Sequence, residues 1–366
     1  MAMRPNGSPP KESPASAGVG RVTSMARWLA RRRQAAAAPR LSVVMPVYNA
    51  ERTLGECLER LFQSTYRDFE LILVDDGSTD RTRAIASDFP ARIVTSSGRV
   101  GPAAARNLGA RVAEGDIVFF IDSDVMVRPD SLAVLMERFE ADEEIDGLVG
   151  VQAADMRFRN LASQYKNLWM RWTYLRCTGD VPLFYTTAAA IRRDAFLRAG
   201  GFDHGYGTPN VEDTAFGQKL RRLGVRVQVQ PDLEVEHVKR YSLWTMLMTD
   251  FRRAVSLTRL KLRHRRDLAD NDTSVPGSYI VSIPLAAFGA LAVLAGLLLR
   301  LPVVAALGAL AGAGVLALNR EFLDQIRRSE GFLVALGAAP LLCLELLVSA
   351  AGAAVGLAGY PFGRRY

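Results

Sequence analysis

The strongest constraint on the fold of this chain is a set of three short apolar runs, each followed directly by polar residues. Unbroken apolar runs of this length are typical of strands covered by helices on both faces. A shorter strand and two segments with helical spacing lie between them. The alternation predicts a doubly wound, mostly parallel α/β sheet that binds ligands at the carboxyl ends of its strands. The predicted strands are 41–48, 71–76, 92–95 and 117–121, and the helices are 51–63 and 102–113.

Polar groups follow the second predicted strand, where ligands are expected. Asp75 and Asp76 end that strand, and Gly77 opens a turn into a helix. A capped turn explains Ser78 and Asp80 without any ligand. It does not explain the two carboxylates at the strand end, which suit the imide N–H of a uracil or a ribose hydroxyl.

A helix after a Gly-Pro turn carries Arg106 and Asn107. From that position the two side chains can reach a base or a phosphate. The alternative is that both simply lie on the surface of the helix.

Asp122 and Asp124 are two residues apart at the end of the last predicted strand. Residues spaced by two along a strand project to the same side. Neighbouring carboxylates suit Mg²⁺ or Mn²⁺, which prefer oxygen ligands and bridge to phosphates. Such a cation would neutralise a diphosphate leaving group.

Glu212 and Asp213 precede a predicted helix from Thr214 to Leu223. Carboxylates are favourable at a helix N-terminus, which is one explanation of the pair. The other is that a carboxylate at this place removes a proton from an acceptor hydroxyl.

Together, these motifs resemble the family 2 inverting glycosyltransferases of the GT-A fold over residues 41–237. The motifs are Pro46-Val-Tyr-Asn49, Asp75-Asp-Gly-Ser-Thr-Asp80, Ala105-Arg-Asn-Leu-Gly109, Asp122-Ser-Asp124, Gly200-Gly-Phe-Asp203 and Glu212-Asp213.

By that resemblance, Asp75 and Arg106 contact the base, and Asp213 is the general base beside Glu212. The resemblance implies a metal site formed by Asp124 and Asp122, with His237 as a further contact. The alternative is that His237 has a structural role only. The predicted nucleotide-sugar site consists of Pro46, Tyr48, Asn49, Glu51, Asp75, Asp76, Gly77, Arg106, Asn107, Asp122 and Ser123.

Two departures from family motifs narrow the expected reaction. Processive members carry Gln-x-x-Arg-Trp, which Lys239-Arg-Tyr-Ser-Leu-Trp244 does not match, so transfer of a single sugar is expected. The segment Asp122-Ser-Asp-Val-Met-Val-Arg-Pro129 differs from that of dolichol-phosphate-mannose synthases. Those synthases transfer a sugar to a phosphate, which needs little help from a base. The carboxylates of Glu212 and Asp213 therefore favour an acceptor hydroxyl over a phosphate.

Long uncharged runs near the C-terminus predict three transmembrane helices at about 280–299, 302–318 and 332–359, within a region 279–360. A short charged loop is expected after Leu318, and Pro340 is expected to kink the third helix. Glu345 should face the helix bundle, because a carboxylate facing lipid is costly. A buried helical core is the alternative to a membrane region.

The remaining segments suggest where the chain works. Residues 1–39 are expected to be disordered and basic, with a possible interfacial helix at Val22–Gln34, and 241–278 to form a basic amphipathic connector. The net charge of +8 has no accompanying nucleic-acid-binding motif, so no nucleic acid is expected. Three separated cysteines indicate neither disulfides nor zinc. We expect a bacterial inner-membrane protein with its catalytic domain, 40–240, in the cytoplasm.

The sequence thus predicts a metal-dependent, membrane-anchored transferase that moves one sugar, from a UDP-sugar by family resemblance, to a hydroxyl of a lipid-linked or membrane-associated acceptor. One alternative is transfer to a polyprenyl phosphate. Another is a membrane scaffold that binds nucleotide-sugars without turnover. Trp169, Trp172 and Tyr174 either shape the acceptor cleft or pack a helix on the sheet.

Overall fold

The computed structural model describes residues 40–204, 211–263 and 274–360. The predicted interfacial helix at 22–34, part of the connector and the C-terminal arginines lie outside them. One eight-stranded sheet organises the first two thirds of the chain, in the order β3-β2-β1-β4-β7-β6-β8-β5. Its strands are β1 Leu41–Val47, β2 Phe69–Asp75, β3 Arg92–Thr95, β4 Ile117–Ile121, β5 Val125–Val127, β6 Gly147–Gln152, β7 Ala188–Arg192 and β8 Val227–His237.

The sheet is mixed, with a parallel half that matches the predicted doubly wound α/β fold. Strands β3, β2, β1 and β4 run parallel to one another, and β6 is parallel to β8. Strand β7 is antiparallel to both β4 and β6, and β5 is antiparallel to β8. The motifs that follow β1, β2 and β4 therefore meet at one edge of the sheet.

Helices cover both faces of the sheet, which explains the unbroken apolar strands. Helices α2 Leu54–Phe62, α3 Thr82–Ser87 and α5 Ser131–Ala141 contribute to the core on one face. On the other face lie α4 Pro102–Val112, α7 Arg193–Arg198 and α8 Glu212–Arg222. Val43 and Val44, neighbours on β1, belong to the two different cores. Alternate residues of one strand thus serve opposite faces.

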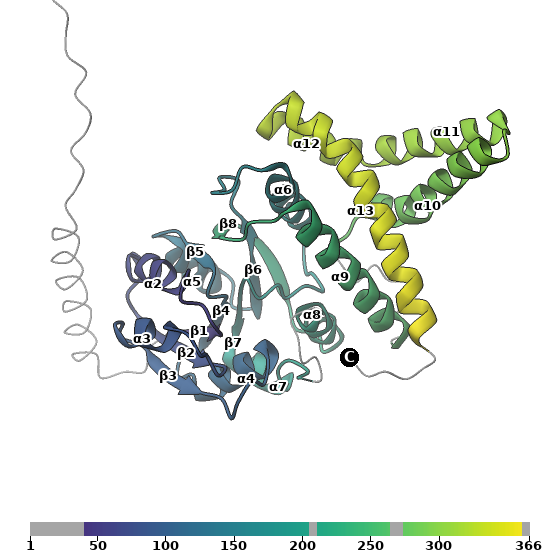
Figure 1. Cartoon of the computed structure of the whole chain (residues 1–366). Coiled ribbons are helices and arrows are strands. Elements are labelled where there is room, and N and C mark those ends of the chain that lie inside the picture. The colour runs from purple at the N-terminus through teal and green to yellow at the C-terminus, as the bar shows by residue number, and fades with distance from the viewer. Residues whose placement is uncertain (1–39, 205–210, 264–273, 361–366) are drawn as a thin grey trace, which may run out of the picture.

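Five further helices follow or flank the sheet: α6 Leu161–Leu175, α9 Leu243–Arg263, α10 Gly277–Leu298, α11 Pro302–Leu318 and α13 Phe332–Gly359, with the short α12 Arg320–Glu330 before α13. Figure 1 shows α9 running beside α13, while α10 and α11 form a hairpin that projects away from the sheet. Helices α10 and α13 are long and apolar enough to cross a membrane. Helices α11 and α12 pass that test only as a pair, and they are bent by 60° at their junction.

The predicted charged loop after Leu318 is wrong, because this segment is helix α12. Its apolar residues recur at the helical spacing of four, which buries Phe322 and Ile326 while the charged residues face outward. The aromatic ring of Phe322 packs on Trp169 and Trp172 of α6. The two tryptophans thus join the sheet domain to the C-terminal helices, and Trp169 also lines a cavity described below.

Glu345 faces the protein interior, as the sequence predicted. Its side chain is 2 % exposed and contacts Tyr165 and Lys166 of α6. Lys166 also pairs with Asp250 of α9. One buried cluster of charges therefore connects α13, α6 and α9.

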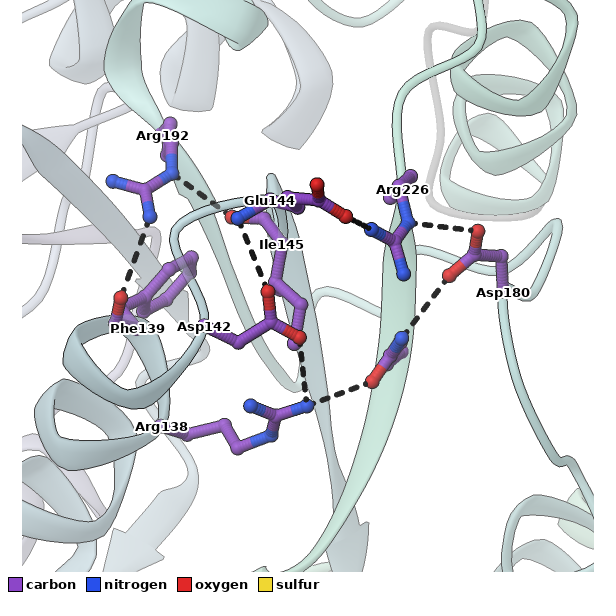
Figure 2. Close-up of polar contacts among 9 residues, drawn as sticks. Arg138, Phe139, Asp142, Glu144, Ile145, Asp180, Arg192 and Arg226 are labelled. Atoms are coloured by element: carbon purple, nitrogen blue, oxygen red, sulfur yellow. Dashed lines mark hydrogen bonds and ion pairs between the residues drawn. The ribbon is translucent and has the colours of Figure 1, made fainter.

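A separate polar network closes the sheet at the amino ends of β6 and β8 (Figure 2). The guanidinium of Arg226 contacts Glu144 at 2.6 Å and Asp180 at 3.2 Å. Arg192, at the end of β7, donates to the carbonyl of Ile145. This edge is opposite to the strand ends that carry the motifs, so we regard the network as structural.

Candidate active site

The carboxyl ends of β1, β2 and β4 bring the predicted motifs together. Asn49 has a left-handed φ of 48°. Its side-chain oxygen accepts from the backbone N–H of Thr79, and its own N–H donates to Ser78 Oγ. Glu51 accepts from the backbone N–H of Arg81. Asn49 and Glu51, both predicted to contact a ligand, therefore hold the loops after β1 and β2 together.

The two carboxylates at the end of β2 have different surroundings. Asp75 accepts from the N–H of Ser78 within its own turn, which begins at Gly77 with φ +83°. Asp76 accepts from the N–H groups of Val100 and Gly101, at 2.8 and 2.9 Å, and also from Ser96. Asp76 thus fastens the loop before α4, which indicates a structural role for this side chain.

Tyr48 directly follows β1 and is exposed at the same edge of the sheet, whereas Pro46 within β1 is partly buried. Its side chain is 38 % exposed, and the guanidinium of Arg99 lies 4.4 Å from its ring centroid. An exposed aromatic ring beside a cation offers a flat surface for a nucleobase. Nothing in the sequence pattern singled out Arg99, because its loop is brought to Tyr48 only by Asp76.

A buried chain of charges crosses the site from α4. Arg106 is 4 % exposed, and its guanidinium contacts Asp122 at 2.7 Å and Glu212 at 3.4 Å. Burial raises the pKa of Asp122, although Arg106 opposes the shift. Arg106 therefore links the end of β4 to the start of α8.

Asn107 does not point to a ligand. Its amide nitrogen donates to the carbonyl of Phe202 at 2.8 Å, and its oxygen accepts from the N–H of the same residue at 2.9 Å. The side chain is 8 % exposed. Asn107 therefore holds the Gly201-Phe202 turn, and its predicted contact with nucleotide conflicts with this placement.

The two aspartates after β4 do not lie on a strand. Asp122, Ser123 and Asp124 form the turn between β4 and β5, so the expected projection to one side through strand alternation is wrong. The carbonyl of Ser123 accepts from the thiol of Cys57. The turn separates the two carboxylates: Asp122 pairs with Arg106, and Asp124 Oδ2 lies 3.2 Å from His237 Nε2.

Asp124 and His237 converge in a way that fits a divalent cation. Burial opposes ionisation of Asp124, but the hydrogen bond and charge of His237 and the charge of Lys239 lower its pKa overall. Within 40–204, 211–263 and 274–360, no three His, Cys, Asp or Glu side chains form a metal site on their own. A cation at this pair would therefore take its other ligands from a bound diphosphate and water, as Mg²⁺ commonly does.

Asp213 lies at the start of α8, on the far side of the charge chain. Burial and the neighbouring Glu212 raise the pKa of Asp213 to about 6, while Arg253 of α9 opposes the shift. A carboxylate with this pKa suits a general base near neutral pH. The sequence did not place Arg253 beside Asp213, because this contact arises only from the packing of α9 on α8.

A cavity of about 260 Å³ adjoins Asp213 between the sheet domain and the C-terminal helices. Arg253 and Tyr174 also line it. A smaller cavity beside His237 shares Lys166, Met170 and Tyr185 with the larger one. Asp213 thus stands between the strand-end site and a cavity of mainly apolar lining.

Comparison with known proteins identifies the part of the sheet domain that carries the groups at the ends of β1, β2 and β4, whereas Glu212, Asp213 and His237 lie beyond the matched residues. Residues 42–199 match the family model described as glycosyl transferase family 2. This segment is a family 2 glycosyltransferase domain.

Curated relatives of the family 2 domain are similar over part of their length. Glycosyltransferase GlyG of Streptococcus pneumoniae is 35 % identical over 115 residues, which are 30 % of this chain and 38 % of that protein. An uncharacterized Haemophilus influenzae glycosyltransferase is 34 % identical over 187 residues, 49 % of this chain and 61 % of the relative. The undecaprenyl-phosphate 4-deoxy-4-formamido-L-arabinose transferase of Pectobacterium carotovorum is 34 % identical over 140 residues, 36 % of this chain and 43 % of the relative. The chain spans 38 %, 40 % and 32 % of the length of three such relatives.

A solved structure extends the likeness to nearly the whole chain. The mannosyltransferase PcManGT from Pyrobaculum calidifontis, in complex with GDP-Man and Mn²⁺, superposes with a TM-score of 0.55 at 20 % identity. The match covers 96 % of this chain and 98 % of that protein. At this identity the likeness concerns the fold, and it confirms the predicted GT-A architecture.

Proposed function

We propose that this protein is a membrane-anchored inverting glycosyltransferase that moves one sugar from a nucleotide-sugar to a hydroxyl of a membrane-associated acceptor. The position of Asp213 carries the proposal. It lies beside the chain Asp122–Arg106–Glu212, which leads to the strand-end site, and it also lines the apolar cavity. A base at that junction faces both a donor and an acceptor.

In the proposed reaction the acceptor hydroxyl attacks the anomeric carbon of the donor. Asp213 takes the hydroxyl proton as the new C–O bond forms, and the nucleoside diphosphate leaves with the electrons of the broken bond. Asp124 and His237 would hold Mg²⁺ or Mn²⁺, which stabilises charge on the departing diphosphate. Attack opposite to the leaving group inverts the anomeric centre.

The donor site is proposed at the ends of β1 and β2. Tyr48 and Arg99 offer a surface for stacking the base, and Asp75 lies at the adjacent strand end. Arg106 holds Asp122 by an ion pair of 2.7 Å beside the proposed donor site. A UDP-sugar is the proposed donor, by family resemblance.

A polyprenyl phosphate is the second candidate acceptor. The Pectobacterium relative is named as an undecaprenyl-phosphate transferase, and Arg253 and Lys261 both line the cavity. These two cations beside an apolar cavity could bind a lipid phosphate, and Arg253 also stabilises the charged form of Asp213.

The test is nucleotide release by the detergent-purified full chain with membrane lipid extract. UDP-, GDP- and dTDP-sugars would be compared with Mn²⁺, Mg²⁺ and a chelator. We expect lipid-dependent release from one donor, lost in Asp124→Asn and in Asp213→Asn. Nucleotide binding without release from any donor would contradict the transferase and favour a scaffold. An acid-labile product that survives in Asp213→Asn would indicate transfer to a phosphate.

A further inference from the structure

The cavity beside Asp213 has the lining of a site for a hydrocarbon chain. Its apolar side chains come from both the family 2 domain and the C-terminal helices. A dry apolar cavity of about 150 Å³ is enough to bind benzene, and this one measures about 260 Å³. The apolar lining includes Trp169, Leu183, Phe184, Leu257, Ile283 and Ala353.

The cavity also has a polar group that lacks a partner. Asp250 of α9 lines it and is 6 % exposed. One carboxylate oxygen pairs with Lys166, but Oδ2 accepts no hydrogen bond from any residue that the structure describes. A buried acceptor without a donor is costly, and a ligand hydroxyl would remove that cost.

The walls of the cavity indicate the source of the ligand. Helices α10 and α13 supply Ile283 and Ala353, and these are the two helices able to cross a membrane. A lipid could enter from the bilayer without exposing its chain to water. Arg253 and Lys261 also line the cavity, so charge alone does not exclude a lipid phosphate. A fully ionised phosphate has no proton to donate to Asp250 Oδ2, whereas a hydroxyl has one, so the unpartnered oxygen favours a lipid alcohol.

We propose that this cavity binds a lipid alcohol with more than one hydroxyl, its chain among α9, α10 and α13 and its hydroxyls at Asp213 and Asp250. The proposal rests on the proposed function and names the acceptor class. Asp213 belongs to α8 of the sheet domain and Asp250 to α9, so neither the sheet domain nor the C-terminal helices alone form the site.

The first experiment maps lipid contacts in the full-length chain in nanodiscs. A photoreactive monoacylglycerol is the probe, and an alkyl phosphate with the same photoreactive chain is compared with it. We expect the first probe to label peptides of α6 and of residues 181–185, which are not outward faces of the membrane helices. Labelling confined to outward faces of α10, α11 and α13, or stronger labelling by the phosphate, would overturn the proposal.

The second experiment fills the cavity. Ala353→Phe places a ring inside it, whereas Ala354→Phe adds the same ring at the next, exposed position of α13. We expect Ala353→Phe to lower both labelling of α6 and lipid-dependent nucleotide release about tenfold, a loss of about 1.4 kcal/mol in binding, because the ring takes the space of the lipid chain. Ala354→Phe should match the unsubstituted chain. Equal results for the two variants would sink the proposal, and if Ala353→Phe does not fold, the contact map of the unsubstituted chain decides.

The two experiments separate this proposal from the proposed function. Labelling of α6 without turnover of any donor would keep the lipid site and reject the transferase. Lipid-dependent turnover that is equal in both alanine variants would keep the transferase and reject this site.

Discussion

At the scale of single residues, burial and neighbouring charges set the ionisation of Asp213, the proposed base. Burial and Glu212 disfavour the charged form of Asp213, whereas Arg253 and Arg106 favour it. Tyr174 and Tyr185 also face this carboxylate. Because Arg253 belongs to α9, a helix that follows the sheet domain influences the pKa of the proposed base.

Arg253→Gln should move the acidic limb of the pH profile of kcat/KM to higher pH. Asp213 works as a base only when deprotonated, so activity falls as the pH drops through its pKa of about 6. Removing the Arg253 cation raises that pKa, so the fall begins at higher pH. Arg253→Lys should restore the position of the limb, because it keeps the charge. A profile that is lower in Arg253→Gln but not displaced would show that Arg253 does not act through Asp213.

Asn107→Ala should affect stability far more than nucleotide binding. The change leaves the buried N–H and carbonyl of Phe202 without their partner, at a cost of about 1–3 kcal/mol in the free energy of unfolding. Thermal unfolding measures that loss, and calorimetry with UDP measures binding. A large loss of UDP affinity in a fully stable variant would instead restore Asn107 to the nucleotide site.

At the scale of elements, the sequence predicted strands β1 to β4, but not β5 to β8 or the turn after β4. Apolar runs identified β1, β2 and β4 because burial on both faces leaves a direct mark on composition. The same reasoning extended the strand through Asp122 and Asp124, where the chain actually turns. No local sequence signal shows that the side chains of Asp76 and Asn107 are hydrogen-bonded to loops distant in the sequence. These contacts form only in the folded chain.

The pairing of α9 with α13 shows a second limit, because it depends on close backbone approach. A Cβ at Gly352 would lie 2.6 Å from the carbonyl oxygen of Phe251, and one at Gly356 would lie 2.7 Å from that of Val255. In the sequence, glycines in an apolar run are typical of membrane helices, so they do not indicate which helix packs against them. Here it lets a charged helix pack directly on an apolar one.

Gly352→Ala should therefore separate α13 from α9. The backbone carbonyl cannot rotate away cheaply, so we expect a loss of about 1–3 kcal/mol in the free energy of unfolding. Gly312→Ala is the matched control on α11, since no atom lies within 4 Å of its added Cβ. That control should be neutral or gain up to about 1 kcal/mol from helix propensity. Thermal unfolding in one detergent compares them, and equal midpoints would refute the close packing.

At the scale of the whole molecule, the direction of the α10–α11 hairpin decides the topology. Helix α12, which follows the hairpin, contacts α6 through Gln164–Glu330 at 2.8 Å and the residue after α6 through Arg176–Glu321 at 2.5 Å. In a protein that spans a membrane through α10 and α13, α12 therefore lies on the same side as the family 2 domain. A chain that leaves this side through α10 must return to it through α11.

Helix α11 is short for a crossing. Its 17 residues span about 26 Å at about 1.5 Å per residue, whereas the hydrocarbon core is about 30 Å thick. The bend between α11 and α12 adds little, because α12 is charged and packs on the domain. The hairpin either crosses a locally thinned membrane or turns back inside it.

Cysteine labelling distinguishes these topologies in the full-length chain. Cys57, Cys177 and Cys343 would be replaced by serine, and Arg300→Cys, Arg328→Cys and Ser87→Cys made singly. We expect an impermeant maleimide to label Arg300→Cys, in the turn between α10 and α11, from the side opposite to Ser87→Cys. Arg328→Cys on α12 should be labelled from the same side as Ser87→Cys. Because α12 fixes one end of the hairpin, labelling of all three from one side would mean a re-entrant hairpin, leaving α13 to span alone.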